Sequence, residues 1–252
     1  MVKMLLISFA IFRILNAFLV QTYFVPDEFW QGPEVAHQIV FGFGHLTWEW
    51  DNGIRSSFHP MLFGLAYKIL SFLGLNSSFS IQTSTRMLGA ATALVGDWAT
   101  YRLALRLCEP KVARTALICQ ALSWCYFFCM TRSLSNSLET GFTAASLALW
   151  PWQTSSQTHV PARPLAALAC ASAAFLVRPT SALFFVPLGI AHLASLPRSQ
   201  PRAAAAILHF GATALACAVA GLSVGMVCDR VCYGRWLFSA WRFLRFNVLE
   251  GG

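Results

Sequence analysis

Long apolar stretches alternate with short polar or charged breaks along almost the whole chain. The stretches lie near residues 4–25, 60–75, 86–107, 112–130, 137–150, 164–177, 180–196 and 203–228. Most approach the roughly 17–25 residues that an α-helix needs to cross a bilayer. Three are shorter (60–75, 137–150 and 164–177), and we expect tilted, interfacial or partly re-entrant helices there. Helices are expected throughout because a helix satisfies its own backbone hydrogen bonds in lipid.

The composition supports this interpretation. The chain is 57% hydrophobic and only 11% charged, whereas soluble proteins are about 25% charged. No alternating barrel pattern and no repeat of 20–50 residues stands out in the sequence. The first run carries Arg13 and Asn16 and lacks a small-x-small exit, so a retained span fits better than a cleaved signal. We therefore predict an all-α integral membrane protein, with residues 1–252 forming a single polytopic domain.

The net charge of +8 is concentrated at junctions between apolar runs. These basic positions are Arg102, Arg106, Lys111, Arg114, Arg163, Arg198 and Arg202. By the positive-inside rule they are expected on the cytosolic side. They form no continuous basic stripe, so nucleic acid is not an expected partner.

The residues that bind metals and cofactors show no ordered spacing. Eight cysteines lie mostly inside apolar runs and six histidines are scattered. The sequence contains no Cys-x-x-Cys, no Gly-rich phosphate loop and no His-Glu-x-x-His. We therefore expect no metal site and no cofactor.

An acidic segment directly follows the first apolar run. Proline 26 ends that run, and Asp27 and Glu28 come next, where the chain should reach the membrane surface. A carboxylate costs about 2.5–3.5 kcal/mol at the bilayer centre but little at its edge. Two interpretations stay open: Asp27 caps the following helix, or it is a base within reach of both lipid and water.

A polar and aromatic loop spans residues 26–59. Four of the ten acidic residues fall between Asp27 and Glu49, and Trp30, Trp48 and Trp50 lie in the same loop. Tryptophan at this position fits an interfacial belt or a platform for the apolar face of a sugar. A belt alone would not need so many carboxylates.

Polar groups recur at the ends of later apolar runs. Arg132, Asn136 and Glu139 are spaced i, i+4, i+7 and would share one face of a helix. Arg178 separates two runs, and Asp229 follows the longest one. Intramembrane or juxtamembrane charges suggest function, although pairs that only hold helices together are an equal alternative.

Two further charged residues lie within apolar runs. For Asp97, among Gly, Ala and Val, we expect a structural partner. Arg13 is expected to pack or snorkel, with an anionic lipid group as a third possibility.

Seven ordered segments resemble one family. They are Arg13-Ile-Leu-Asn, Phe24-Val-Pro-Asp-Glu-Phe-Trp-Gln, Leu46-Thr-Trp-Glu-Trp, Arg132-x-Leu-Ser-Asn-x-x-Glu, Arg178-Pro-Thr, Asp229-Arg-x-x-Tyr-Gly-x-Trp and Phe246-Asn-Val-Leu. Together they resemble the glycosylphosphatidylinositol (GPI) mannosyltransferase 3 group of glycosyltransferase family 22. Family chains are about twice as long, so this chain resembles their N-terminal half.

The resemblance implies a multi-spanning GT-C fold in the endoplasmic reticulum membrane, with loop 26–59 as the first lumenal loop. It implies transfer of mannose from dolichol-phosphate-mannose to the GPI precursor, as the third mannose in α1,2 linkage. In the family's acidic motif the aspartate, here Asp27, is the proposed catalytic base, and Glu28 matches the second acid. The implied partners are a lipid-linked donor, a GPI glycolipid acceptor and the membrane.

We infer a single inverting displacement, in which a base such as Asp27 typically contributes about 10²–10⁴ in rate. Arg178 and Arg132 are candidates to hold the leaving phosphate. The remaining candidate substrate-binding residues are Asn136, Glu139, Asp229 and Trp48.

Alternatives are a mannosyltransferase of the dolichol-linked N-glycan pathway, a truncated non-catalytic membrane protein and, more weakly, a transporter. Two arrangements in the membrane are possible. The four motifs at Asp27, Arg132, Arg178 and Asp229 face the same side of the membrane if run 60–75, which carries Lys68, does not fully cross it. Otherwise one motif faces the cytosol and is structural.

Overall fold

The computed structural model describes residues 2–152, 161–196 and 203–251, and within these ranges it contains helices and no strands. Arg198 and Arg202 lie outside the described residues. The main helices are α1 (Val2–Leu19), α5 (Phe58–Phe72), α6 (Ser78–Leu107), α7 (Pro110–Leu122), α8 (Trp124–Cys129), α9 (Ser135–Leu149), α10 (Pro164–Val177), α11 (Ala182–Ser195) and α12 (Ala203–Tyr233). Shorter helices are α2 (Asp27–Trp30), α3 (Pro33–Phe41), α4 (Trp48–Asp51) and α13 (Ser239–Leu244), with single turns at Pro179–Ser181 and Arg245–Leu249. Within these ranges the prediction of an all-helical fold is confirmed.

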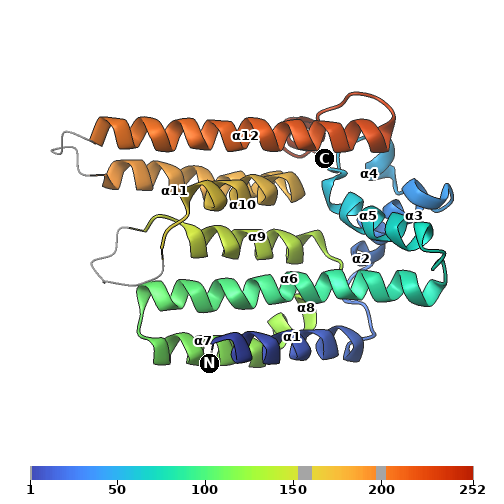
Figure 1. Cartoon of the computed structure of the whole chain (residues 1–252). Coiled ribbons are helices and arrows are strands. Elements are labelled where there is room, and N and C mark those ends of the chain that lie inside the picture. The colour runs from blue at the N-terminus through green and yellow to red at the C-terminus, as the bar shows by residue number, and fades with distance from the viewer. Residues whose placement is uncertain (1, 153–160, 197–202, 252) are drawn as a thin grey trace.

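The long helices lie side by side and form one bundle (Figure 1). Helix α6 packs against α1, α7 and α9, and α10 packs against α9 and α12. Helices α2 to α5 gather at one end of the bundle, where α5 packs against α3 (Figure 1). The run 60–75 thus forms α5 within this end cluster and does not extend along the bundle.

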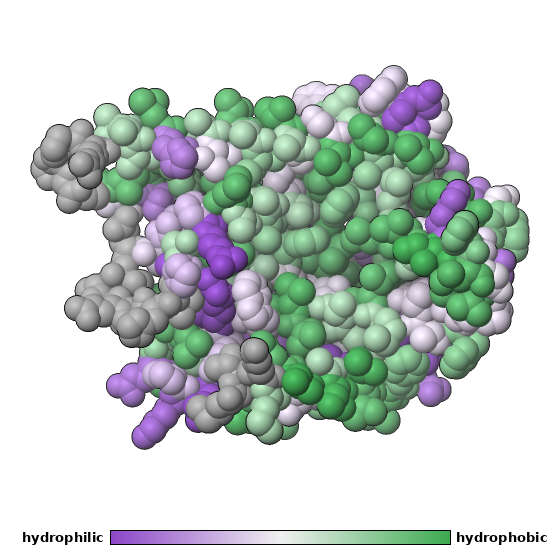
Figure 2. Space-filling model, viewed as in Figure 1, coloured by the Kyte–Doolittle hydropathy of each residue, from purple (hydrophilic) through white to green (hydrophobic). Residues whose placement is uncertain are grey.

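One described helix, Ala204–Tyr233, is long and apolar enough to cross a membrane by length and composition. Shorter apolar helices cover Met4–Leu19, Pro164–Val177 and Pro179–Ser195. Figure 2 shows apolar residues over the middle of the visible face and hydrophilic residues mostly near its two ends.

A buried ion pair joins α1 to α6. The Nε and Nη2 atoms of Arg13 donate to the carboxylate of Asp97 at 2.7 and 2.8 Å, and both side chains are almost fully buried. Gln120 of α7 donates to the same carboxylate at 2.9 Å. The expected structural partner of Asp97 is confirmed, and Arg13 packs against neighbouring helices instead of snorkelling.

Two glycines let the segment before α9 approach α6 closely. A Cβ on Gly89 would lie 2.0 Å from the carbonyl oxygen of Thr131, and one on Gly96 would lie 1.8 Å from the hydroxyl oxygen of Tyr126. Any larger residue at Gly89 would meet the backbone of Thr131 and push this segment away, whereas a larger residue at Gly96 would require the side chain of Tyr126 to move. The glycines therefore help to position the residues that follow, including Arg132 and Asn136.

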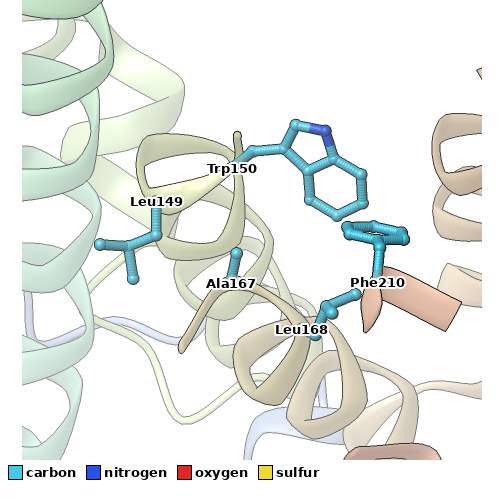
Figure 3. Packing of buried hydrophobic residues seen from close by; sticks show 5 residues of the cluster. All are labelled: Leu149, Trp150, Ala167, Leu168 and Phe210. Carbon is cyan, nitrogen blue, oxygen red and sulfur yellow. The ribbon is translucent and has the colours of Figure 1, made fainter. Parts of the chain in front are cut away.

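The other end of the bundle has its own apolar core. Trp150 and Phe210 meet edge to face with ring centroids 5.8 Å apart, above Ala167 and Leu168 (Figure 3). Arg106 donates to the carbonyl oxygen of Trp150 at 2.5 Å. This core ties together α9, α10 and α12 at the end away from α2 to α5 (Figure 1).

Candidate active site

The four sequence motifs meet at one end of the bundle. Asp27 follows α1, Arg132 precedes α9, Arg178 follows α10 and Asp229 lies in the last two turns of α12. These helix ends all lie beside the α2 to α5 cluster (Figure 1). Helix α6 runs from this end to the opposite one, where it carries Arg102 and Arg106 in its last two turns. The arrangement is the one expected if run 60–75 does not cross the bundle.

A cavity of about 590 Å³ opens at this end and holds residues from three of the four motifs. We call it the Asp27 cavity. Its polar wall includes Asp27, Gln31, Arg55, Asn136 and Arg178. Its apolar wall includes Phe24, Val25, Tyr126, Met130 and Leu134. The cavity thus combines a carboxylate and two guanidinium groups with an apolar surface.

Asp27 is exposed and begins α2. Its Oδ2 atom accepts a hydrogen bond from Nε2 of Gln31 at 2.7 Å. The residue in the N-cap position of α2 is Pro26, and no side-chain bond caps this helix. The capping interpretation of Asp27 is therefore wrong, and its carboxylate faces the cavity with a side-chain partner.

Gln31 joins the acidic motif to α9. Its side chain is buried, and its Oε1 atom accepts a hydrogen bond from the hydroxyl of Ser135 at 3.4 Å. Because Gln31 bonds both Asp27 and Ser135, it holds the carboxylate in position relative to α9. Gln31 was not among the predicted site residues, although its i, i+4 spacing from Asp27 would allow this contact.

Arg178 is held by two residues of α9. Its Nη1 atom donates to Oδ1 of Asn136, and its Nε atom lies 3.8 Å from Oε2 of Glu139. The i, i+3 spacing of Asn136 and Glu139 places both on the α9 face that meets Arg178. The predicted shared helix face is confirmed for these two residues but is wrong for Arg132, which precedes α9.

Arg55 is a second cation in the Asp27 cavity. Its Nη2 atom donates to Oε1 of Glu49 at 2.6 Å, while its buried Nε atom has no partner among the described residues. Its backbone carbonyl accepts from the hydroxyl of Tyr233 at 2.7 Å. The sequence analysis gave Arg55 no role, because nothing in its local pattern shows that the chain returns to Asp27.

Glu28 and Arg132 lie outside the Asp27 cavity. Oε1 of buried Glu28 accepts from the backbone N–H groups of Phe24 and Val25 at 2.5 and 3.4 Å. Oε2 of Glu28 accepts from Nη1 of Arg132 at 3.3 Å. Both side chains line a different cavity. The carboxylates of Glu28 and Asp27 therefore lie in different cavities. Arg132 was expected beside Arg178, but the two arginines also line different cavities.

Asp229 and Trp48 also lie away from the wall of the Asp27 cavity. Asp229 is 1% exposed and accepts from the backbone N–H groups of Ser57 and Ser239 at 2.9 and 3.4 Å. This geometry fixes α12 to α5 and α13. Trp48 is exposed and packs against Phe246, with ring centroids 5.6 Å apart. In this structure both side chains make contacts within the protein, and their predicted substrate contacts stay predictions.

His59 is a buried side chain that packs against the end of the acidic motif. It is 3% exposed and packs against Gly32, where a Cβ would lie 2.9 Å from its Cε1 atom. Its Nδ1 atom lies 3.3 Å from the carbonyl oxygen of Gln31. Burial disfavours the charged imidazolium and lowers the pKa of His59 from 6.5 to about 4. His59 is therefore neutral at physiological pH.

The side chains that bind metals do not cluster in the described part of the chain. No group of three or more His, Cys, Asp or Glu residues there is placed to hold an ion. The Asp27 cavity offers one carboxylate, two guanidinium groups, amide side chains, and hydroxyl and thiol groups.

Comparison with known protein families adds an independent finding. Residues 4–252 match the profile of the Alg9-like mannosyltransferase family. This chain belongs to the Alg9-like mannosyltransferase family. The earlier resemblance, drawn from the seven segments, is thereby confirmed.

Relatives within the Alg9-like family are similar over nearly the whole chain. GPI alpha-1,2-mannosyltransferase 3 of Homo sapiens is 39% identical over 250 residues, which cover 99% of this chain and 43% of that protein. Mannosyltransferase APTG1 of Arabidopsis thaliana is 38% identical over 96% of this chain and 43% of its own length. GPI mannosyltransferase 3 of Drosophila melanogaster is 34% identical, with 94% and 39% covered. The chain thus spans less than half the length of these relatives. No solved structure matches it.

Proposed function

We propose that the protein containing this chain is a GPI α1,2-mannosyltransferase that takes mannose from dolichol-phosphate-mannose. Membership of the Alg9-like family supports the mannosyl transfer, and the names of the human and Drosophila relatives support a GPI acceptor. The observation that carries the proposal is the Asp27 cavity, where one carboxylate and two guanidinium groups meet an apolar wall.

The cavity suits a displacement at the anomeric carbon. A hydroxyl oxygen of the acceptor forms the new bond to this carbon as the bond to the phosphate oxygen breaks. The hydroxyl proton passes to the carboxylate of Asp27, and the electron pair of the broken bond leaves with the dolichyl phosphate. One displacement inverts the anomeric configuration, so no second, nucleophilic carboxylate is needed.

The leaving phosphate needs cations, because negative charge develops on it as the bond breaks. Arg178 lines the cavity and is fixed by Asn136 and Glu139. Arg55 lines the same cavity, where its guanidinium group is a second cation. We therefore assign binding of the leaving phosphate to Arg178 and Arg55, and no longer to Arg132.

The proposal extends to the arrangement in the membrane, which the same features support. The long helices lie parallel, apolar residues cover the middle of the visible face, and the basic residues Arg102 and Arg106 lie at the end opposite Asp27 (Figures 1 and 2). The positive-inside rule then assigns the basic end to the cytosol and the Asp27 end to the lumen of the endoplasmic reticulum. In this arrangement the bundle crosses the membrane several times, and α2 to α5 form the lumenal end.

The test is a transfer assay in membranes from cells that lack GPI mannosyltransferase 3 and express the protein containing this chain. Radiolabelled dolichol-phosphate-mannose should label a GPI precursor, and an α1,2-specific mannosidase should remove the label. A label found only on dolichol-linked N-glycan precursors would contradict the GPI assignment. A complete absence of label, with protein present at the level of an active relative, would contradict the transferase assignment.

A further inference from the structure

A second cavity, of about 430 Å³, has the Glu28–Arg132 pair in its wall. It is lined by residues from the end of α1, from α3, from the first turns of α6 and from the segment 131–133. We call it the Arg132 cavity. The mechanism described above does not use this cavity, although its wall carries several charged and polar side chains.

An unsatisfied donor lies in the wall of this cavity. Arg132 is 9% exposed, and its Nη2 atom has no hydrogen-bond partner among the described residues. Its Nη1 atom bonds Glu28, and its Nε atom donates to the carbonyl oxygen of Phe128 at 2.9 Å. A buried donor left unpaired loses its hydration without compensation, so a ligand oxygen at Nη2 would be favourable.

Three further polar side chains line the same cavity. Oε1 of Glu34 accepts from the backbone N–H of His45 at 3.0 Å, which leaves Oε2 as a second acceptor. Gln82, exposed on α6, offers both an amide donor and a carbonyl acceptor. Arg86 lies over the ring of Phe18, 5.6 Å from its centroid, and lines the same cavity.

The charges of the wall indicate a neutral ligand. Two guanidinium groups, of Arg86 and Arg132, face two carboxylates, of Glu28 and Glu34. Their formal charges cancel, so the wall offers hydrogen-bond donors and acceptors but no net positive charge that would attract a phosphate. A group rich in hydroxyls both donates and accepts, and it matches such a wall better than an anion does.

Two aromatic rings complete the cavity. Tyr23 and Phe29 pack edge to face with centroids 6.2 Å apart, and both remain largely exposed. Such rings offer an apolar surface for the C–H face of a sugar. We propose that the Arg132 cavity is a carbohydrate-binding subsite for a neutral hexose ring. Its identification with a ring of the acceptor glycan, remote from the hydroxyl that reacts at Asp27, rests on the proposed function.

The test measures binding of methyl α-D-mannoside to the chain in lipid nanodiscs by saturation-transfer NMR. Gln82→Ala and, separately, Glu34→Gln should each raise the Kd about three- to tenfold, the effect of losing one hydrogen bond. Ala is a good helix former, and Gln retains an acceptor for His45, so both variants should fold. The matched control is Thr83→Ala, one residue along α6 and outside the cavity wall, which should bind as the unmodified chain does.

Asp27→Asn separates this inference from the proposed function. Because Asp27 lines the other cavity, this variant should bind methyl α-D-mannoside with unchanged Kd even though it should not transfer mannose. Unchanged binding by both Gln82→Ala and Glu34→Gln would overturn the assignment. Loss of binding in Asp27→Asn alone would move the sugar to the Asp27 cavity and would also overturn it.

Discussion

Asp27 and Glu28 are neighbours in the chain, yet their carboxylates lie in different cavities and have different partners. Asp27 is exposed and accepts a hydrogen bond from the side chain of Gln31. Glu28 is buried, accepts from two backbone N–H groups and pairs with Arg132. Successive residues of a helix point about 100° apart, so the short helix α2 directs one acid into the Asp27 cavity and the other into the protein.

The first prediction concerns the stability of the acidic motif. Glu28→Ala should lower the free energy of unfolding by about 3–5 kcal/mol, because it leaves the buried charge of Arg132 unpaired. The control, Asp27→Ala, should change it by less than about 1 kcal/mol, since Asp27 is exposed. Thermal unfolding in nanodiscs measures both. Equal losses from the two substitutions would mean that Glu28 does not hold the motif in place.

The second prediction concerns the buried pair between α1 and α6. Asp97→Ala should destabilise the protein by about 3–5 kcal/mol, because Arg13 would stay buried without a counter-charge. The double variant Arg13→Met, Asp97→Leu should regain most of this loss, since apolar residues of similar volume need no partner. Unfolding of Asp97→Ala, of the double variant and of the unmodified protein, measured side by side, tests this. A double variant no more stable than Asp97→Ala would contradict the expected coupling.

The third prediction concerns Arg178. Arg178→Ala should reduce kcat/KM for the donor about tenfold to a hundredfold, the effect of losing a charge-assisted hydrogen bond. Arg178→Lys should restore only part of the activity, because lysine lacks the planar fork that contacts phosphate and Asn136 together. Donor and acceptor titrations in membranes measure the two effects separately.

The control for Arg178 is Arg230→Ala, which removes an exposed arginine near the end of α12 outside the wall of the Asp27 cavity. It should leave the donor kinetics unchanged. If Arg178→Ala lowers protein abundance but leaves the KM for the donor unchanged, Arg178 is a packing residue.

The fourth prediction is a pH dependence of stability. The pKa of His59 is about 4 in the folded protein instead of the usual 6.5. Between these values the unfolded chain binds a proton that the folded protein does not, so stability falls as the pH falls through this window. The full loss is about 3 kcal/mol below pH 4, at about 1.4 kcal/mol per pH unit.

Chemical unfolding at several pH values between 4 and 7 measures this dependence. His59→Gln keeps a donor for the carbonyl oxygen of Gln31 but has no titrating ring. It should be less stable at neutral pH, and its stability should vary less between pH 6.5 and 4. An unchanged slope would mean that other groups cause the loss at low pH.

Several features of the fold and the site were predictable because they depend on local pattern. Apolar runs of helical length gave the helices, and i, i+3 spacing placed Asn136 and Glu139 on one face toward Arg178. A lone carboxylate in an apolar run required a partner, and Asp97 has Arg13. If the four motifs face the same side of the membrane, the short run 60–75 should not cross it, and in the structure this run forms α5 in the cluster at one end of the bundle (Figure 1).

The remaining features depend on contacts between distant parts of the chain. The rotation of a four-residue helix decides which of two adjacent acids is buried, and no periodic pattern is long enough to show it. Arg132 pairs with a residue 104 positions earlier, so its separation from Arg178 follows from tertiary packing alone. Arg55 reaches the Asp27 cavity because the chain turns back after α4, which local sequence does not reveal.

The most direct test of the central claim is mannosyl transfer by Asp27→Asn in membranes that contain the protein carrying this chain. Asparagine has nearly the same shape and can still accept a hydrogen bond from Gln31, but it cannot take the acceptor's proton. We predict that transfer falls at least about a hundredfold, while protein abundance and unfolding temperature stay unchanged. Transfer at the unmodified rate would show that Asp27 is not the base and would contradict the assignment of the cavity.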